Sequence, residues 1–406
     1  MQKTHDNKRV AMRYIDNSKA AYSVDWYMTK RCNFDCSYCA EYLHDSHSES
    51  PSLSQMKRLV DIIEDKHFNN VLWSLTGGEP MVIPHFQEIL QYIAMSNPRN
   101  ISITTNGSVP TKKYMEAYDN GLDNITLSMH FEFIENREQE YLDRIIALEA
   151  YRKQWNQSHQ KDYNYKEKKL VARFMVYPGA LEQVNRMYEV LKSANIERIE
   201  FRNIRPQVGQ GQDQMPTKKL DMSFDHASVR DASIIHENPN EFRMPKTYDN
   251  VQEKLEKRRH KDSKIIQIVA ERARKKESWY SSEERKEVDA LYKVEGRKAL
   301  QEYFEDGSSR LIHYNELTFN RNTDFNGFKC WAGAMHMKIA PNGDIYVGSC
   351  HVGGKLGNIF DLDDTFVLPT EPIICPKHVC TDNLDLRVPK ALPGYEHLIE
   401  NYVSKR

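Results

Sequence analysis

The stretch Cys32-Asn-Phe-Asp-Cys36-Ser-Tyr-Cys39 holds three thiols in the spacing C-x3-C-x2-C. The residues just before it, Ser23–Thr29, are apolar and aromatic enough to form a buried strand. The three thiols are therefore predicted to lie in a short loop at the carboxyl end of that strand. Thiolates are soft ligands, and soft ligands favour iron–sulfur clusters or zinc.

The spacing of these thiols favours iron over zinc. A [4Fe–4S] cluster held by three close cysteines keeps one iron without a protein ligand, and that iron is open to another molecule. A structural zinc ion requires four ligands. The nearest candidates for a fourth ligand are His44 and His47, so zinc remains the alternative interpretation of this loop.

A second motif, Gly77-Gly78-Glu79-Pro80, follows a second predicted strand about forty residues further on. The two motifs in this order resemble the radical S-adenosylmethionine (SAM) superfamily. The resemblance implies that the amino and carboxylate groups of SAM bind the open iron. It further implies that one electron from the cluster breaks the S–C5′ bond, and that the resulting 5′-deoxyadenosyl radical abstracts a substrate hydrogen. A one-electron reductant such as flavodoxin or ferredoxin is the implied partner.

Apolar runs of period two alternate with helical stripes through the first half of the chain. Such alternation predicts parallel βα units, and six units over about 185 residues suit the partial (β/α)6 barrel of TIM type that the radical SAM family has. The predicted strands are Ser23–Thr29, Val71–Thr76, Ile101–Thr105, Asn124–His130, Lys169–Tyr177 and Arg198–Arg202. The predicted helices are Ser52–Asp65, His85–Ser96, Thr111–Asn120, Glu138–Gln154 and Leu181–Ala194.

The fold class is therefore α/β, and three domains are predicted. Residues 1–205 form the radical SAM partial barrel, with the polar residues 1–20 draped over it. Residues 206–324 form a charged, mostly helical insertion, with a hairpin turn at Asp306-Gly307. Residues 325–406 form a small, hairpin-containing cluster domain.

Functional residues of βα barrels lie at the carboxyl ends of the strands. The resemblance implies that Gly77, Gly78, Glu79 and Pro80 form the methionine-binding motif and that Tyr38 lies near adenine. By strand end, Thr105, Asn106 and Ser128 match positions that contact the methionine or ribose of SAM. Arg173 pairs either the SAM carboxylate or a structural acid. His130, Glu132 and Tyr177 are the candidate catalytic residues that meet substrate; ordinary buried polar roles are the alternative for each.

Four further cysteines, Cys330, Cys350, Cys375 and Cys380, lie near the other end of the chain. A β-hairpin is predicted around Pro341-Asn342-Gly343, between the first two. Four thiols enclose an iron–sulfur cluster completely. The pattern resembles the twitch extension of radical SAM enzymes, a shortened SPASM domain, although six residues rather than four separate Gly343 from Cys350. A four-cysteine zinc site is the alternative.

Composition limits the other possibilities. The 406 residues carry a formal net charge of −1, which gives no electrostatic argument for nucleic acid. The basic segment 254–276 is interpreted as a solvated helical face, with a patch for nucleic acid or an anionic substrate as the alternative. We find neither a secretory signal nor an apolar run long enough for a membrane span, so a cytoplasmic protein is expected. In that compartment the seven cysteines favour metal binding over disulfides.

The sequence thus predicts an enzyme with two [4Fe–4S] clusters, one that binds SAM and one auxiliary. A fully ligated auxiliary cluster accepts an electron, which favours two-electron oxidation of a substrate C–H bond, as in twitch-bearing dehydrogenases. The first alternative is radical modification of a peptide or protein, through a thioether or C–C crosslink. A zinc-binding interaction module is the second. Whether the substrate is a small molecule or a peptide is left open.

Overall fold

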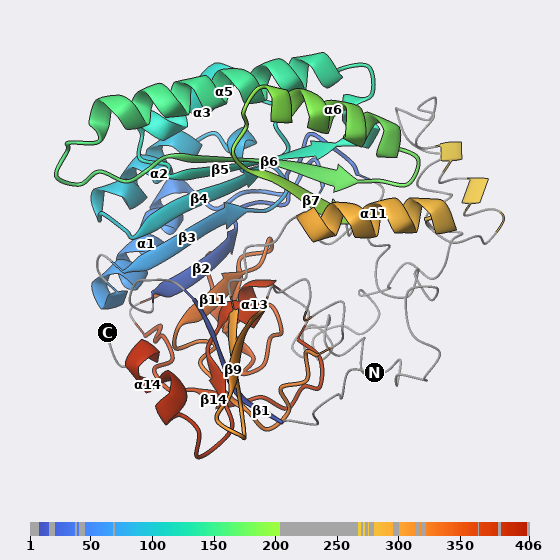
Figure 1. The fold of residues 1–406 in the computed structure, drawn as a ribbon. Coiled ribbons are helices and arrows are strands. Elements are labelled where there is room, and N and C mark those ends of the chain that lie inside the picture. The colour runs from blue at the N-terminus through green and yellow to red at the C-terminus, as the bar shows by residue number, and fades with distance from the viewer. Residues whose placement is uncertain are drawn as a thin grey trace. The chain divides into compact units, whose positions relative to one another are not determined.

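The computed structural model describes residues 8–15, 21–36, 39, 45–67, 70–203, 267–268, 271–272, 275, 280–294, 300–312, 317, 322–363, 365–380 and 383–403. These residues fall into two compact units (Figure 1). The parallel-sheet unit begins at Trp26 and takes in the described residues up to 203 and between 267 and 294. The cysteine-quartet unit comprises the described residues of 8–25 and those from 300 onward.

Five strands of the parallel-sheet unit pair in parallel and in sequence order. They are β3 (Val71–Thr76), β4 (Asn100–Thr105), β5 (Asn124–His130), β6 (Lys169–Val176) and β7 (Ile199–Asn203). The end of β2 (Tyr22–Tyr27) lies beside β3, because Met28 donates its backbone N–H to Thr76 O at 2.9 Å. The helices are α1 (Leu53–His67), η1 (Pro80–Val82), α2 (Phe86–Met95), α3 (Thr111–Asp119), α4 (Phe131–Ile134), α5 (Glu138–His159), α6 (Leu181–Ser193) and α11 (Ser282–Val294).

This alternation confirms the predicted α/β class, and the predicted strand and helix boundaries agree to within a few residues. The helix α1 illustrates why: Ser52 precedes it, accepts the backbone N–H of Gln55 through Oγ at 3.3 Å and donates its own N–H to Gln55 Oε1 at 2.9 Å. This reciprocal pair gives hydrogen-bond acceptors to two backbone N–H groups that have no partner within the helix at its start.

The two faces of the parallel sheet differ in polarity because successive side chains of a strand point to opposite faces. One face carries Ile101, Ile103, Ile125, Leu127 and Phe174, all at most 1% exposed. Helices pack on this face: Trp73 Nε1 donates to Glu64 of α1 at 2.9 Å. Figure 1 shows α5 and α6 lying along one side of the strands. The register places mostly polar side chains on the other face, among them Ser74, Ser102, Thr104, Thr126, Ser128, Arg173 and Glu200.

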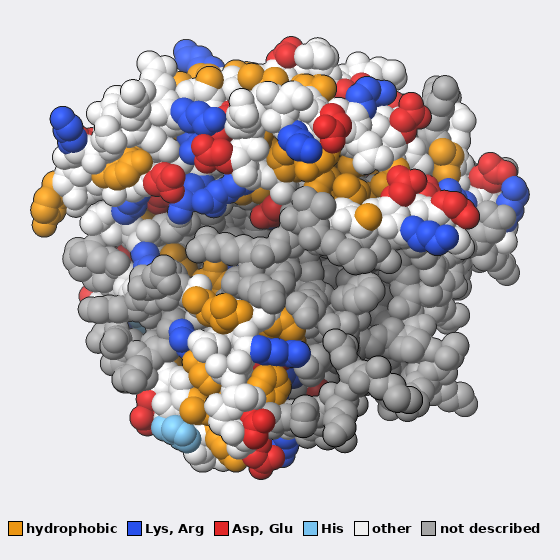
Figure 2. All heavy atoms as spheres, viewed as in Figure 1, with side chains coloured by type: hydrophobic (Ala, Val, Ile, Leu, Met, Phe, Trp, Pro, Cys, Tyr) orange, Lys and Arg blue, Asp and Glu red, His pale blue; other side chains and the backbone are white. Residues whose placement is uncertain are grey.

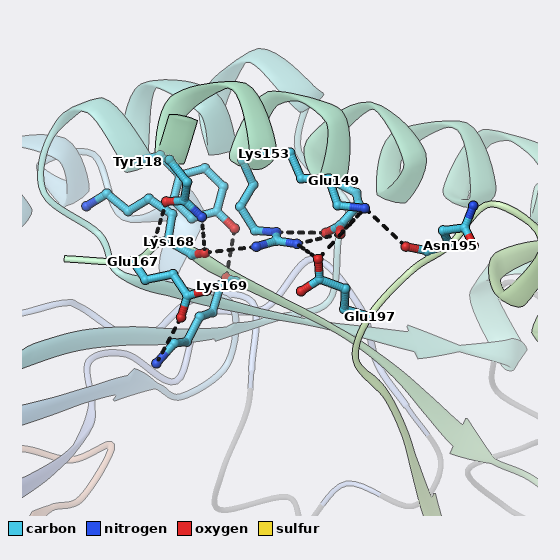
Figure 3. A network of polar contacts seen from close by, with 10 residues as sticks. Tyr118, Glu149, Lys153, Glu167, Lys168, Lys169, Asn195 and Glu197 are labelled. Atoms are coloured by element: carbon cyan, nitrogen blue, oxygen red, sulfur yellow. Dashed lines mark hydrogen bonds and ion pairs between the residues drawn. The ribbon is translucent and has the colours of Figure 1, made fainter. Parts of the chain in front are cut away.

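A buried charge network joins α5 to the sheet (Figure 3). Arg152 is 4% exposed and donates through Nε to Glu149 at 2.8 Å, and it forms an ion pair with Glu197 at 3.0 Å. Arg152 Nη1 also donates to the carbonyl of Lys168, whose ammonium lies 3.3 Å from Asp123. Since desolvation offsets much of the attraction between buried charges, we interpret the network as fixing where α5 sits rather than as a large source of stability.

The cysteine-quartet unit contains a six-stranded sheet in the order β14-β10-β15-β1-β8-β9. Strand β1 (Arg9–Tyr14) pairs antiparallel with β8 (Leu300–Phe304) and β15 (Lys390–Ala391). Its buried Arg9 forms an ion pair with Glu302 at 2.8 Å and lies over the ring of Phe325. The prediction that residues 1–20 drape over the barrel is therefore wrong for Arg9–Tyr14, which form an interior strand. The polarity of the sequence was misleading here because Arg9 and Arg13 flank the apolar residues Val10, Ala11 and Met12.

Both predicted hairpins of the quartet unit are confirmed. Gly343, at a φ of +87°, donates to Ala340 O at 2.9 Å between β11 (His336–Ile339) and β12 (Asp344–Tyr346). Gly307 closes the turn between β8 and β9 (Ser309–Ile312). The remaining elements are β10 (Lys329–Cys330), β13 (Lys355–Asn358), β14 (Ile373–Ile374), α13 (Asn383–Arg387) and α14 (His397–Val403).

Much of the predicted helical insertion, residues 206–324, lies outside the described residues, as does most of the basic segment 254–276. Within it, α11 is helical as expected, whereas β8 and β9 belong to the sheet of the quartet unit. The boundaries of the three predicted domains stay a prediction. None of the described helices is long and apolar enough to cross a membrane. On the helices of the parallel-sheet unit, Figure 2 shows Lys and Arg side chains interspersed with Asp and Glu.

Candidate functional site

Two glycines hold the end of β3 against the backbone that leads into the cysteine loop. Gly78 donates its N–H to Thr29 O at 2.8 Å, and Glu79 donates to Arg31 O at 2.8 Å. A Cβ on Gly78 would lie 2.2 Å from Arg31 O, and one on Gly77 would lie 2.6 Å from Thr29 O. In the structure these glycines permit a close approach of the chain to itself, and their role in the SAM methionine site stays a prediction.

The carboxylate of Glu79 joins the ends of β3 and β4. The residue is 0% exposed, and its side chain accepts hydrogen bonds from Asn106 N at 2.7 Å, Thr105 Oγ1 at 2.8 Å and Met81 N at 3.0 Å. Burial raises the pKa of this carboxyl to about 7, against the lowering effect of the three donors. The Glu79 side chain is thus a structural brace, and so is the Thr105 hydroxyl that it binds.

Asn106 connects the end of β4 to the cysteine loop. Its Nδ2 donates to Asn33 Oδ1 at 2.9 Å and approaches Cys32 Sγ at 3.8 Å. Cys32 Sγ also accepts the backbone N–H of Phe34 at 3.4 Å. Burial raises the pKa of the Cys32 thiol to about 11. Cys32 therefore has two N–H donors aimed at its sulfur, and donors of this kind stabilise a thiolate that binds metal.

The end of β5 meets the same loop. Cys36 Sγ lies 3.4 Å from His130 Nδ1. The ring of Phe34 stacks on Phe133 at a centroid distance of 4.3 Å and meets His130 edge-on at 6.1 Å. Burial, together with the positive charge of Arg173, lowers the pKa of His130 to about 4. His130 is therefore neutral at neutral pH.

Arg173 lies on the polar face of β6, between Ser128 of β5 and Glu200 of β7 in the register. Its Nη2 forms an ion pair with Glu200 at 2.9 Å, and its Nε donates to the same carboxylate at 3.0 Å. Of the two roles left open by the sequence, the structural ion pair is thus present. A contact between Arg173 and the SAM carboxylate stays a prediction.

The structure brings most of the predicted site residues together. Gly77, Gly78, Glu79, Thr105, Asn106 and His130 surround the described part of the cysteine loop, while Pro80 begins η1 and Ser128 lies on the polar face. Tyr38 and His44 lie outside the described residues. Glu132 and Tyr177 are 2% and 0% exposed. Sequence reasoning missed Asn33, Phe34 and Phe133; the position of the first two inside the cysteine loop was the available signal.

The four cysteines of the quartet unit are also gathered. Cys330, Cys375 and Cys380 share one buried apolar cluster. Cys350 is held beside Asp385, whose carboxylate accepts the N–H of Cys350 at 2.7 Å and that of Ser349 at 2.9 Å. Burial raises the pKa of Cys350 well above its ordinary value, and the charges of Asp385, Cys380 and Cys330 add to that rise. The four thiols therefore lie close enough for the charge of one to raise the pKa of another.

Among the described residues, no three His, Cys, Asp or Glu side chains are arranged around a common point as ligands of a metal ion. What fits an iron–sulfur cluster is the chemistry of the donors. Three thiols follow β2, four more lie in the quartet unit, where Cys330, Cys375 and Cys380 are buried, and none of the seven is in a disulfide bond in the described residues. Their assignment as Cys32, Cys36 and Cys39 for one cluster and Cys330, Cys350, Cys375 and Cys380 for another stays a prediction.

Comparison with known families identifies the class of this site. Residues 26–192 match the family model described as Radical SAM superfamily. This part of the chain, which holds the cysteine loop and the strand ends just described, is therefore a radical SAM domain, as the two motifs predicted. The domain implies SAM and a [4Fe–4S] cluster as cofactors.

Several curated proteins resemble parts of the chain. A mitochondrial GTP 3′,8-cyclase of Arabidopsis thaliana is 33% identical over 120 residues, which are 27% of this chain and 30% of the relative. A probable GTP 3′,8-cyclase of Metallosphaera sedula is 29% identical over 190 residues, 45% of this chain and 56% of the relative. An S-adenosylmethionine-dependent nucleotide dehydratase of Selenomonas ruminantium is 33% identical over 89 residues, 22% of this chain and 31% of the relative.

The chain thus spans between 30% and 56% of the length of these relatives. Among solved structures, SuiB of Streptococcus suis bound to S-adenosylmethionine is 15% identical with a TM-score of 0.42, covering 86% of this chain and 67% of that one. Native anSMEcpe with bound AdoMet is 13% identical with a TM-score of 0.41, covering 84% and 78%. The family match and the relatives, which are named as enzymes, indicate that this chain is an enzyme.

Proposed function

We propose that this protein is a radical SAM enzyme that oxidises a substrate C–H bond by two electrons. The observation that carries the proposal is the convergence of three strand ends on the cysteine loop. Gly78 after β3 contacts the backbone that leads into that loop, and Asn106 after β4 and His130 at the end of β5 approach its thiols. Parallel βα domains bind their ligands at this end of the sheet.

Cys32, Cys36 and Cys39 hold the first [4Fe–4S] cluster in this proposal, at the open end of a partial (β/α)6 barrel. When bound, the cluster and SAM supply a 5′-deoxyadenosyl radical that takes a hydrogen atom from the substrate. The protein contributes orientation and shielding from water. Gly77, Gly78, Glu79 and Pro80 set the shape of the SAM methionine site, and Tyr38, Thr105, Asn106, Ser128 and Arg173 complete the SAM site.

The proposal assigns His130 to the proton that leaves with the second electron. The position of His130 favours it for this role, because it ends β5 beside the cysteine loop with its Nδ1 3.4 Å from Cys36 Sγ. Glu132 and Tyr177 are the other candidates, and they are 2% and 0% exposed. The balance is then one hydrogen atom to the radical, one proton to His130 and one electron to the auxiliary cluster that the second set of cysteines would hold, so the product is two hydrogens lighter than the substrate.

Cys330, Cys350, Cys375 and Cys380 hold the auxiliary cluster that accepts this electron. Because four thiolates saturate a cluster, electron transfer rather than substrate binding is the role open to it. The quartet unit is accordingly assigned as a twitch-like domain, and an external one-electron reductant of the flavodoxin or ferredoxin kind supplies the electron for each cleavage of SAM.

A nucleotide is the second candidate for the substrate class. The observation that favours it is the naming of the reported relatives, which are GTP 3′,8-cyclases and a nucleotide dehydratase. In that case the reaction at the same strand ends is a rearrangement or elimination on the nucleotide rather than an oxidation.

The test is product analysis with the reconstituted enzyme, SAM, a reductant and panels of small molecules, nucleotides and peptides. Oxidation predicts a product two mass units lighter, with one 5′-deoxyadenosine for each product. A Cys375→Ala variant should still cleave SAM but form little product. A wild-type yield from that variant would rule out the assigned electron acceptor, and a cyclised or dehydrated nucleotide would favour the second candidate.

A further inference from the structure

Lys390 is a buried lysine placed directly opposite a thiol of the quartet. In the antiparallel pairing of β10 with β15, Cys330 and Lys390 are Cα partners. Side chains of directly opposed residues lie on the same face of the two strands. Cys330 is 7% exposed and Lys390 is 2% exposed, so both side chains enter the interior of the unit together.

The ammonium of Lys390 is held by neutral groups. Its Nζ donates to two backbone carbonyls: that of Asp385 in α13, and that of Val388 just after this helix at 2.8 Å. It also lies 5.1 Å from the centre of the Phe325 ring. In the described residues, both hydrogen bonds recorded for Nζ therefore go to backbone carbonyls and none to a carboxylate. The carboxylate of the same Asp385 accepts the N–H groups of Ser349 and Cys350 instead, and a buried ammonium that is not directly paired with a carboxylate is costly.

The groups around Lys390 indicate which anion completes the site. Phe325, Cys330, Cys375 and Cys380 belong to one buried cluster. Because Lys390 is the Cα partner of Cys330 and its ammonium lies over the ring of Phe325, its side chain enters the cluster that holds three of the four cysteines.

We propose that Lys390 is the built-in counter-charge of the auxiliary cluster and sets its reduction potential. This inference rests on the proposed function, because it takes the quartet as the ligands of a [4Fe–4S] cluster. A cluster held by four thiolates is anionic and gains one more negative charge when it accepts an electron. A fixed positive charge nearby stabilises the reduced state more than the oxidised state, and so raises the potential. Lys390 acts as a positioning residue, through the cluster, and does not touch substrate.

The neighbouring Lys329 supplies a matched control. It precedes Cys330 in β10 but points to the other face of the strand, where its ammonium pairs with Glu396 and its side chain is 37% exposed. Replacing Lys329 removes the same charge from the next residue along the chain, on the face away from Cys330. A simple change in the net charge of the protein would affect both variants equally.

The experiment uses the full chain with Cys32, Cys36 and Cys39 all replaced by Ala, so that any remaining iron is in the quartet. Iron content and a redox titration followed by electron paramagnetic resonance are measured for this protein and for its Lys390→Met, Lys390→Gln, Lys390→Arg and Lys329→Met variants. We expect about four iron per chain. Lys390→Met and Lys390→Gln should favour the oxidised state at least tenfold, a shift of about 59 mV or more to lower potential. Lys390→Arg and Lys329→Met should keep the parent potential.

Each outcome bears on a different statement. Absence of iron in the parent protein would refute the proposed auxiliary cluster, and this inference with it. A loaded cluster whose potential is the same in Lys390→Met, Lys390→Gln and the parent would overturn the inference alone. If the two neutral variants fail to load iron, loading in Lys390→Arg supports the counter-charge, whereas failure in Lys390→Arg as well, or an equal shift in Lys329→Met, refutes it.

Discussion

The carboxylate of Glu79 accepts the backbone N–H of Asn106 at 2.7 Å, and this hydrogen bond ties the end of β3 to the end of β4. Asn106 in turn directs its side chain to Asn33 and Cys32 in the cysteine loop. A buried carboxylate thus holds the residue that orients a thiol. We therefore expect Glu79 to affect the stability of the fold and the order of the loop together.

The first prediction concerns the pH dependence of stability. Burial raises the pKa of Glu79 from 4.5 to about 7 in the folded protein, so the folded state holds this proton more tightly than the unfolded state does. The contribution of Glu79 to the free energy of unfolding is full below pH 4.5 and is lost as pH rises to about 7. The loss is about 3 kcal/mol. Urea unfolding at several pH values measures it.

The matched variant for this prediction is Glu79→Gln, which does not titrate. As pH rises across this range, the unfolding free energy of wild type should fall, whereas Glu79→Gln should not lose stability. The unfolding free energy of wild type should therefore fall relative to that of the variant. Parallel pH profiles for the two proteins would refute the raised pKa.

The second prediction concerns the contact between Gly78 and the loop. Gly78→Ala drives a Cβ into Arg31 O, and overpacking of this kind costs about 1–3 kcal/mol. Because the clash is with the backbone that leads into the cysteine loop, Cys32 in the metal-free protein should also be alkylated faster. Mass spectrometry after iodoacetamide treatment measures that rate.

Gly307→Ala is the control for Gly78→Ala. Gly307 has a φ of +82° and open space around its Cβ position, so alanine there costs about 1–2 kcal/mol through backbone strain alone. It should leave Cys32 alkylation unchanged. If Gly78→Ala also leaves that rate unchanged, the glycine contact does not order the loop.

The third prediction separates the two roles of Arg173. Arg173→Met and Glu200→Gln both break the ion pair at 2.9 Å, which is partly exposed and contributes at most about 1 kcal/mol. If Arg173 also binds the SAM carboxylate, Arg173→Met should weaken SAM binding at least tenfold, while Glu200→Gln should not. Isothermal titration of the reconstituted protein with SAM measures both. Equal SAM affinity in the two variants would leave Arg173 with its structural role only.

The parallel-sheet unit was predictable from sequence because its strands have local signals. In Val71–Thr76 every second side chain is buried, and Gly77 marks the strand end. The interior strand Arg9–Tyr14 was not predictable, because its burial depends on Glu302, far along the chain, which neutralises Arg9. The strands β10, β14 and β15 have two residues each, which is too short for an alternation of buried and exposed residues to be recognised in the sequence.

The candidate site shows the same division. The two motifs located Cys32, Cys36, Gly77, Gly78 and Glu79 because each motif directly follows a predicted strand. They did not reveal that the Glu79 side chain is a brace, since its partner Asn106 comes from another strand. Nor did they reveal Lys390, which is opposite Cys330 only because β10 and β15 pair.

The most direct test of the account is cleavage of SAM by the reconstituted protein. The anaerobic, dithionite-reduced protein is incubated with SAM, and 5′-deoxyadenosine is quantified together with iron for wild type, Cys36→Ala and Cys375→Ala. We expect about eight iron per wild-type chain, 5′-deoxyadenosine from wild type and Cys375→Ala, and none from Cys36→Ala. A wild-type protein that carries its clusters and forms no 5′-deoxyadenosine, or one that binds zinc in place of iron, would contradict the account.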